Sequence, residues 1–125
     1  MSEGGHTYLR KFTERIFNTL HYFRSMAATQ QLNKFKESLK TNEPPDLLSP
    51  HAKALWYAGR RDWEKAHEIV QDLSDETASR IHAFLHRQEG DISNAKYWYA
   101  KAKCEMPAST VDKEWEDLVK IVIEQ

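Results

Sequence analysis

Two histidines, His82 and His86, have the spacing in this chain that most directly permits chemistry. Residues four apart share one face of a helix, so an H-x3-H pair can place two imidazoles on one metal ion. A zinc site needs a third ligand, which His51, His67 or Glu89 could supply. The alternative is that His82 and His86 are core residues, hydrogen-bonded because a buried polar group needs a partner. We expect the buried pair, with no cofactor. A small enzyme, or a protein that binds a metal or another ligand through the two histidines, is the alternative.

The rest of the sequence specifies no reaction. It contains no phosphate-cradling glycine loop, no nucleophile elbow and no acidic cluster spaced for a metal. Cys104 is the only cysteine, which rules out an internal disulfide and a cysteine zinc cluster. The net charge of −1 disfavours nucleic acid as the main partner. No apolar run approaches the roughly 18 residues that span a bilayer, and we expect a cytoplasmic protein.

The histidines fall within a series of short predicted helices. A chain of 125 residues with only 4 Gly and 4 Pro fits one all-α domain. Ser49 followed by Pro50 predicts a helix start, and Asp62, Asp75 and Asp91 are suitable caps for three more helices. Ser109 or Thr110 caps a last one. The predicted helices cover about 50–59, 63–73, 76–89, 92–104 and 110 onward.

Two segments match at a constant offset of 29 residues. Ala54 aligns with Ala83, and Asp62 aligns with Asp91. Each unit therefore reads as a helix, a short turn capped by Asp, and a second helix. Small residues recur where two helices must approach closely.

The second unit resembles a tetratricopeptide repeat. The segment 90–95, followed by Tyr99, Ala102 and Pro107, follows the pattern of the second half of that repeat. The stretch 56–98 is also similar to small uncharacterised bacterial proteins of this type. The resemblance implies a short antiparallel array of two helical hairpins at 49–108. An N-terminal helix and linker at 26–48 and a helix at 109–125 would cap it.

In tetratricopeptide proteins the first helix of each hairpin lines a groove that holds peptides. The resemblance therefore implies a non-enzymatic protein–protein interaction module or adaptor, with a protein or peptide partner. The residues that would line the groove are His51, Leu55, Arg80, Phe84 and Arg87. Two arginines beside an apolar residue suit an acidic peptide. The alternative is that both arginines are solvated and pair with Glu76 or Glu89.

Residues 1–25 form an N-terminal extension that is partly helical. Its apolar residues recur at helical spacing, with basic residues beside them. The stripe consists of Leu9, Phe12, Ile16, Leu20 and Phe23. It could lie on a membrane surface, but we expect it to pack on its own domain. Met26 offers a second possible start, so the extension is also a candidate gene-start error. Near the other end, we expect Trp98 and Tyr99 in the core and Tyr97 packed under the last helix.

Overall fold

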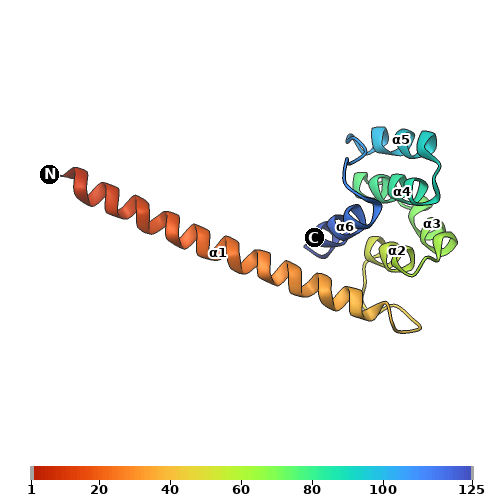
Figure 1. The fold of residues 1–125 in the computed structure, drawn as a ribbon, viewed down its shortest axis with the longest axis horizontal. Helices are drawn as coiled ribbons and strands as arrows, with labels where there is room; N and C mark the ends of the chain where they lie inside the picture. Colours follow the sequence, from red (N-terminus) through yellow and green to blue (C-terminus); the bar gives the residue numbers. More distant parts are fainter. Residues whose placement is uncertain (1, 125) are drawn as a thin grey trace.

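The computed structural model describes the backbone of residues 2–124 and the side chains of residues 8–124. Within that range the chain forms six helices and no strand, which confirms the all-α prediction (Figure 1). The helices are α1 (Ser2–Ser38), α2 (Pro50–Gly59), α3 (Trp63–Gln71), α4 (Glu76–Glu89), α5 (Ile92–Lys101) and α6 (Val111–Ile123).

Five of the helices begin at the predicted capping residues. The hydroxyl of Ser49 accepts a hydrogen bond from the Ala52 amide at the start of α2. Asp62, Asp75, Asp91 and Thr110 each accept in the same way from the amide three residues on. Each cap satisfies an amide that has no partner within its helix, so these starts follow from local sequence.

The four central helices form two successive pairs, α2 with α3 and α4 with α5, and α3 also packs against α4. The aligned alanines Ala54 and Ala83 are fully buried, which lets the paired helices approach closely. The turns of the two pairs correspond as well. Arg61 and Gly90 occupy equivalent positions, and both have left-handed backbone, with φ of 64° and 92°.

Helix α6 packs against α1, α2 and α4. The indole N–H of Trp115 donates a 2.8 Å hydrogen bond to the Leu55 carbonyl of α2. Trp115, Leu118 and Val119 join one apolar core with residues of α2 and α4. The C-terminal helix is therefore an integral layer of the core.

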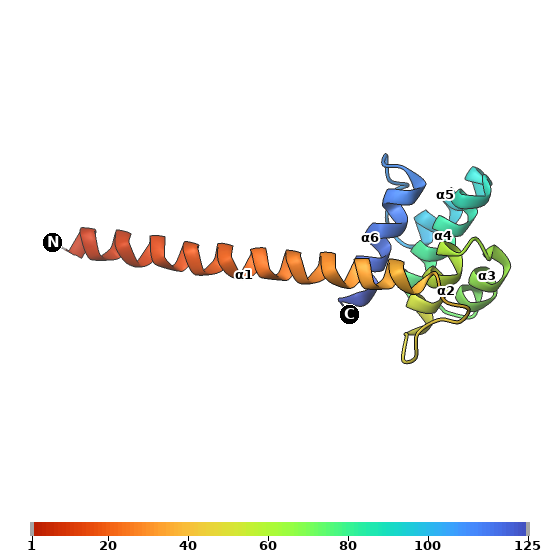
Figure 2. The same ribbon diagram turned by 60° about the horizontal axis from the view of Figure 1, so that its bottom comes forward.

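Helix α1 is continuous, where the sequence predicted separate helices on either side of residue 25. Only its C-terminal part joins the core. Leu32 and Phe35 are buried, and the Phe35 ring lies 5.8 Å from that of Trp115, centroid to centroid. The rest of α1 projects away from the other five helices, as two views show (Figures 1 and 2).

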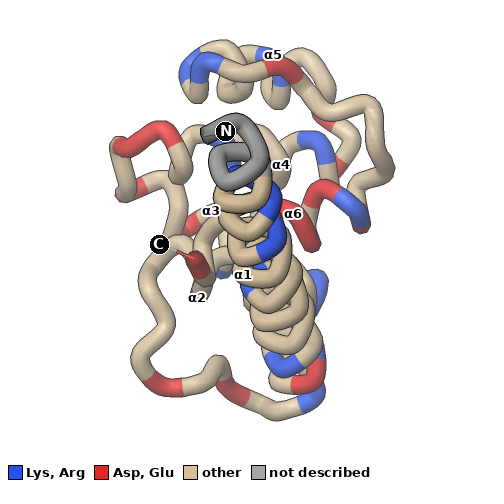
Figure 3. The backbone as a smooth tube through the Cα atoms, turned by 90° about the vertical axis from the view of Figure 1, so that its left-hand side faces the viewer, with Lys and Arg blue, Asp and Glu red and all other residues tan. Residues whose placement is uncertain are grey.

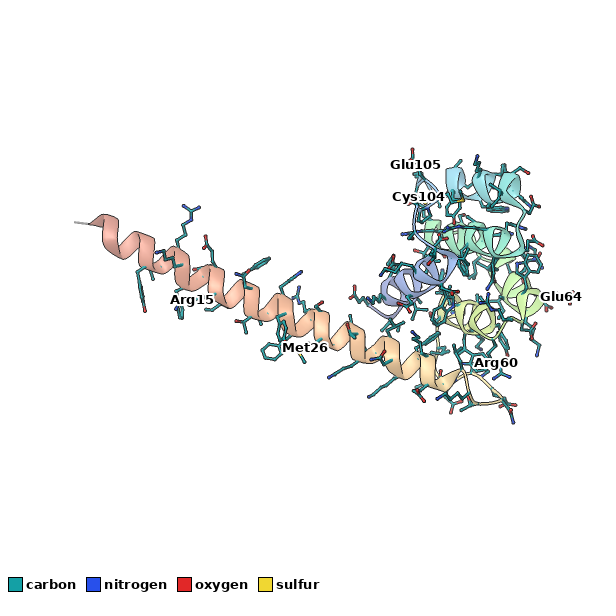
Figure 4. The ribbon with its side chains drawn as sticks, in the orientation of Figure 1. Arg15, Met26, Arg60, Glu64, Cys104 and Glu105 are labelled. Carbon is teal, nitrogen blue, oxygen red and sulfur yellow. The ribbon has the colours of Figure 1, made fainter. Side chains whose placement is uncertain are left out.

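The apolar stripe of the N-terminal extension does not pack on its own domain, contrary to expectation. Its five members are 47–63% exposed: Leu9, Phe12, Ile16, Leu20 and Phe23. The reason is that the stripe and the buried face of α1 point in different directions around the helix axis. At about 100° per residue, the stripe lies roughly 130° around the helix axis from the face that carries Leu32 and Phe35. Figure 4 labels Arg15 and Met26 on this projecting part, with no other helix beside them.

In the described part of the chain, no helix combines the length and the apolar character needed to cross a membrane.

Candidate functional site

Three histidines from two neighbouring helices converge. His67 lies on α3, and His82 and His86 lie one turn apart on α4. The Nε2 atoms of His67 and His82 are 2.9 Å apart, so one imidazole donates a hydrogen bond to the other. One ring nitrogen from each histidine lies within 4.8 Å of the other two. Of the three candidate third ligands, the structure brings His67 into this histidine cluster.

His86 is held by two polar neighbours. Its Nδ1 lies 2.7 Å from a carboxylate oxygen of Glu89, one turn further along α4. A carboxylate can only accept, so Nδ1 carries the proton and Nε2 keeps a lone pair in the neutral ring. The side-chain amide of Asn94, on α5, lies 3.4 Å from that Nε2. Glu89 therefore selects the tautomer that leaves Nε2 free to accept a hydrogen bond or to bind a metal.

Two tryptophans cover the histidine cluster. The ring of Trp98 stacks on His82 with centroids 3.8 Å apart, and Trp63 stacks on His67 at 4.7 Å. The Trp63 indole N–H donates a 2.6 Å hydrogen bond to the Leu85 carbonyl, which fixes that ring against α4. The stacked rings restrict rotation of both imidazoles.

Burial sets the charge of two members of the histidine cluster, His67 and His82. His82 and His86 are each only 6% exposed, and His67 is half-buried. Burial, followed by repulsion from His67 and His86, lowers the pKa of His82 to about 4. The pKa of His67 is lowered by burial and by His86, with Glu89 acting in the opposite direction. His67 and His82 are therefore neutral at neutral pH. Both histidines of the predicted pair, His82 and His86, are buried and hydrogen-bonded.

Helix α6 lies beside the helices expected to line a groove, α2 and α4. Leu55 and Phe84 are both fully buried in the core, and Phe84 also lines a hollow beside it. The hollow has a volume of about 250 Å³, and Gly59, Gln88 and Trp115 are among its other lining residues.

The polar residues assigned to the groove have other partners or surroundings. Nε2 of His51 lies 2.8 Å from a carboxylate oxygen of Asp75, which also caps α4. Arg87 pairs with Glu114 of α6 at 2.9 Å, rather than with Glu76 or Glu89. Arg80 is half-buried, and its Nε is buried without a hydrogen-bond partner. Neither arginine is fully solvated.

The buried carboxylate of Glu114 is a polar site that sequence reasoning missed. It accepts hydrogen bonds from the Tyr99 hydroxyl and from Arg87. Its position gave a usable signal, because Glu114 lies three residues after Val111 and four before Leu118. A charged residue on the apolar stripe of a helix predicts a buried partner. Tyr99 is buried as expected and Trp98 is half-buried, but Tyr97 is 55% exposed and does not pack under the last helix as predicted.

Comparisons of this chain with protein-family models, with curated proteins and with solved structures find no match.

Proposed function

We propose that this protein is a non-enzymatic protein–protein interaction module of tetratricopeptide-like type, and that its contact surface is the apolar stripe of α1. The partner we assign to that surface is a second copy of the chain. The observation that carries the proposal is the exposure of eight large apolar side chains along one side of the projecting helix. They are Tyr8, Leu9, Phe12, Ile16, Leu20, Tyr22, Phe23 and Met26.

The stripe has the spacing of a helix-pairing surface. Leu9, Ile16 and Phe23 recur every seven residues, and Phe12 and Met26 fall at the second apolar position of the same heptads. A helical segment without tertiary contacts is marginal in water, since most helix stability in proteins comes from packing of an amphipathic face. Pairing with a second α1 would supply that packing.

The exposed area is sufficient for a stable dimer. The eight side chains are 40–69% exposed. With roughly 150–250 Å² for a whole aromatic side chain, they present about 800 Å² per chain. That value matches the area each partner contributes to an interface of standard size.

Charge favours an antiparallel pair. Residues 8–27 carry four basic residues and one acidic residue, a net charge of +3. The whole chain is −1, which leaves −4 for the remainder. Figure 3 looks along α1, with Lys and Arg in blue, and most of the Asp and Glu positions, in red, lie on the other helices and the loops between them. In an antiparallel dimer the basic end of one α1 would approach the acidic helices of the other copy. The basic residues are Arg10, Lys11, Arg15 and Arg24.

Sedimentation equilibrium of the full chain tests the proposal. We expect a dimer that dissociates in the variant Phe12→Glu/Ile16→Glu. The matched control is Asn18→Glu/His21→Glu, which adds the same charge to exposed positions on the opposite side of α1 and should leave the dimer intact. A monomeric wild-type protein at tens of micromolar would overturn the proposal. Co-sedimentation of that monomer with anionic lipid vesicles would assign the stripe to a membrane surface instead.

A further inference from the structure

We propose that His67, His82 and His86 form a binding site for one divalent transition-metal ion, with zinc as the best-fitting ion. This inference is independent of the dimer, because the histidine cluster lies in α3 and α4 while the apolar stripe lies in the projecting part of α1.

The distances between the donor atoms bracket those of a zinc site. A zinc–nitrogen bond is about 2.0–2.1 Å, so two imidazole nitrogens on a tetrahedral ion lie about 3.4 Å apart. The two Nε2 atoms of His67 and His82 are 2.9 Å apart, and no pair in the three-histidine group exceeds 4.8 Å. Adjustments of about 1 Å at the ring ends would bring all three onto one ion.

The tautomer of His86 suits metal binding. Metal binding requires neutral imidazoles with a free lone pair, and imidazole suits zinc, copper and nickel. The carboxylate of Glu89, 2.7 Å from Nδ1 of His86, directs the lone pair of that ring to Nε2. A carboxylate behind a metal-binding histidine is a recurrent arrangement that orients the ring and raises its basicity. The hydrogen bond from Asn94 to the same Nε2 is long, at 3.4 Å, and a metal would replace it.

A second group of possible ligands fits less well. His86, Glu89 and Asp91 also lie within ligand distance of one another. Asp91, however, caps α5 by accepting a hydrogen bond from the Asn94 amide, and both carboxylates are exposed. In the three-histidine group, by contrast, two of the three ligands are buried, and metal binding would not break the N-terminal cap of a helix. This group is therefore the site we assign.

Three imidazoles leave one position of a tetrahedral ion open. Such sites hold water or an exchangeable ligand there, in contrast to closed structural sites with four protein ligands. The stacked rings of Trp63 and Trp98 cover two of the three histidines, so these tryptophans are reporters of the site.

The test is a zinc titration of tag-free, full-length protein after exhaustive chelation, followed by competition with a chromophoric chelator. We expect one zinc ion per chain and a raised unfolding temperature, because a ligand that binds only the folded state stabilises it. Cobalt should bind at the same site, with the visible absorption of a four-coordinate ion, and should quench tryptophan fluorescence.

Two variants locate the bound metal. His67→Gln removes a half-buried donor and should abolish stoichiometric binding. Glu89→Gln changes an exposed side chain and should weaken binding about 10- to 100-fold while the three ligands remain. The control His51→Gln, which alters a histidine paired with Asp75, should bind as the wild type does.

The outcomes separate the site from adventitious binding. Absence of one-to-one binding by the wild type would overturn the proposal, and so would equal affinity in the wild type and His67→Gln. Circular dichroism establishes that each variant is folded. If His67→Gln unfolds, Glu89→Gln must bind zinc more weakly than His51→Gln, and Asp91→Asn, which changes a ligand of the second group only, must bind as the wild type does. Any other result would overturn the assignment.

Discussion

The hydroxyl of Tyr99 lies 2.7 Å from each of the two carboxylate oxygens of Glu114. Tyr99 belongs to α5 and Glu114 to α6, and Arg87 of α4 completes the group at 2.9 Å. The Arg87 guanidinium also donates to the carbonyl of Ser109, just before α6. The carboxylate is fully buried, and its hydrogen-bond partners come from α4 and α5. These contacts fix the position of α6, which packs on α2 and α4, the helices expected to line a groove.

Replacing Arg87 with methionine should destabilise the fold by about 3–5 kcal/mol, because it leaves the buried Glu114 carboxylate without its countercharge. Chemical denaturation monitored by circular dichroism measures the loss. The double variant Arg87→Met/Glu114→Gln is the control and should recover much of the difference, since a neutral amide needs no countercharge. A single variant as stable as the wild type would contradict the role assigned to the pair.

Tyr99 should stay protonated in alkali while the protein is folded. Burial and then the neighbouring Glu114 raise the pKa of its phenol, whereas Arg87 opposes the shift. A pKa raised on folding stabilises the protein fully below the unfolded value of about 10, and this contribution is lost as the pH rises above it. Stability of the wild type should therefore fall more steeply above about pH 10 than that of Tyr99→Phe. Urea unfolding from pH 8 to pH 11 checks this, and parallel curves would refute it.

Arg61→Gly should stabilise the protein by about 0.5–1 kcal/mol. Arg61 has φ of 64°, a left-handed conformation that costs a residue with a side chain roughly 1–2 kcal/mol. Glycine removes this strain from the folded state. Part of the gain is lost because glycine also raises the conformational entropy of the unfolded chain. The ion pair of Arg61 with Asp112 is exposed and adds little.

The equivalent turn provides the reverse experiment. Gly90 has φ of 92°, and a Cβ there would meet nothing within 4 Å. Gly90→Ala should therefore lower stability by about 1 kcal/mol through backbone strain alone. Thermal unfolding of both variants gives the comparison, and shifts of the same sign would contradict the assigned strain.

Gly59→Ala should cost about 1–3 kcal/mol through overpacking. An added Cβ would lie 2.8 Å from Cζ2 of Trp115 and 3.0 Å from Cδ1 of Leu39. The Trp115 ring cannot retreat freely, because its indole N–H is bonded to the Leu55 carbonyl. Denaturant midpoints measure the effect, and the exposed substitution Gln71→Ala at the end of α3 is a control expected to stay within about 0.5 kcal/mol.

The features that depend only on residues close together in the sequence were predictable. The caps of α2 to α6 and the paired alanines depend on residues a few positions apart, and the structure has them where the sequence indicated. The H-x3-H pair was equally visible, because its two members share one helix face. His67 was only one of several candidate third ligands, since α3 and α4 must first pack together to bring it near.

Features that depend on which face meets which neighbour were not predictable. The apolar stripe of α1 could equally have packed on the core of its own chain or on a partner. Only the burial of Leu32 and Phe35, on a different face of α1, shows that the stripe faces away from the core. The position of α6 beside the expected groove was not predictable for a related reason. The apolar face of α6 would have suited a helix that caps one end of the array equally well. Its observed position against α2 and α4 depends on tertiary packing, which the local sequence does not specify.

The uninterrupted course of α1 has a mechanical consequence. Residues 8–27 extend about 30 Å at 1.5 Å per residue, and no hinge separates them from Phe35 in the core. Once paired as proposed above, this segment would be a straight, stiff helix of fixed length and direction relative to the core. In an antiparallel pair, two such helices would hold the histidine clusters of the two copies at opposite ends of a rod. A glycine insertion near Ala27 would break that geometric coupling while leaving each end chemically unchanged.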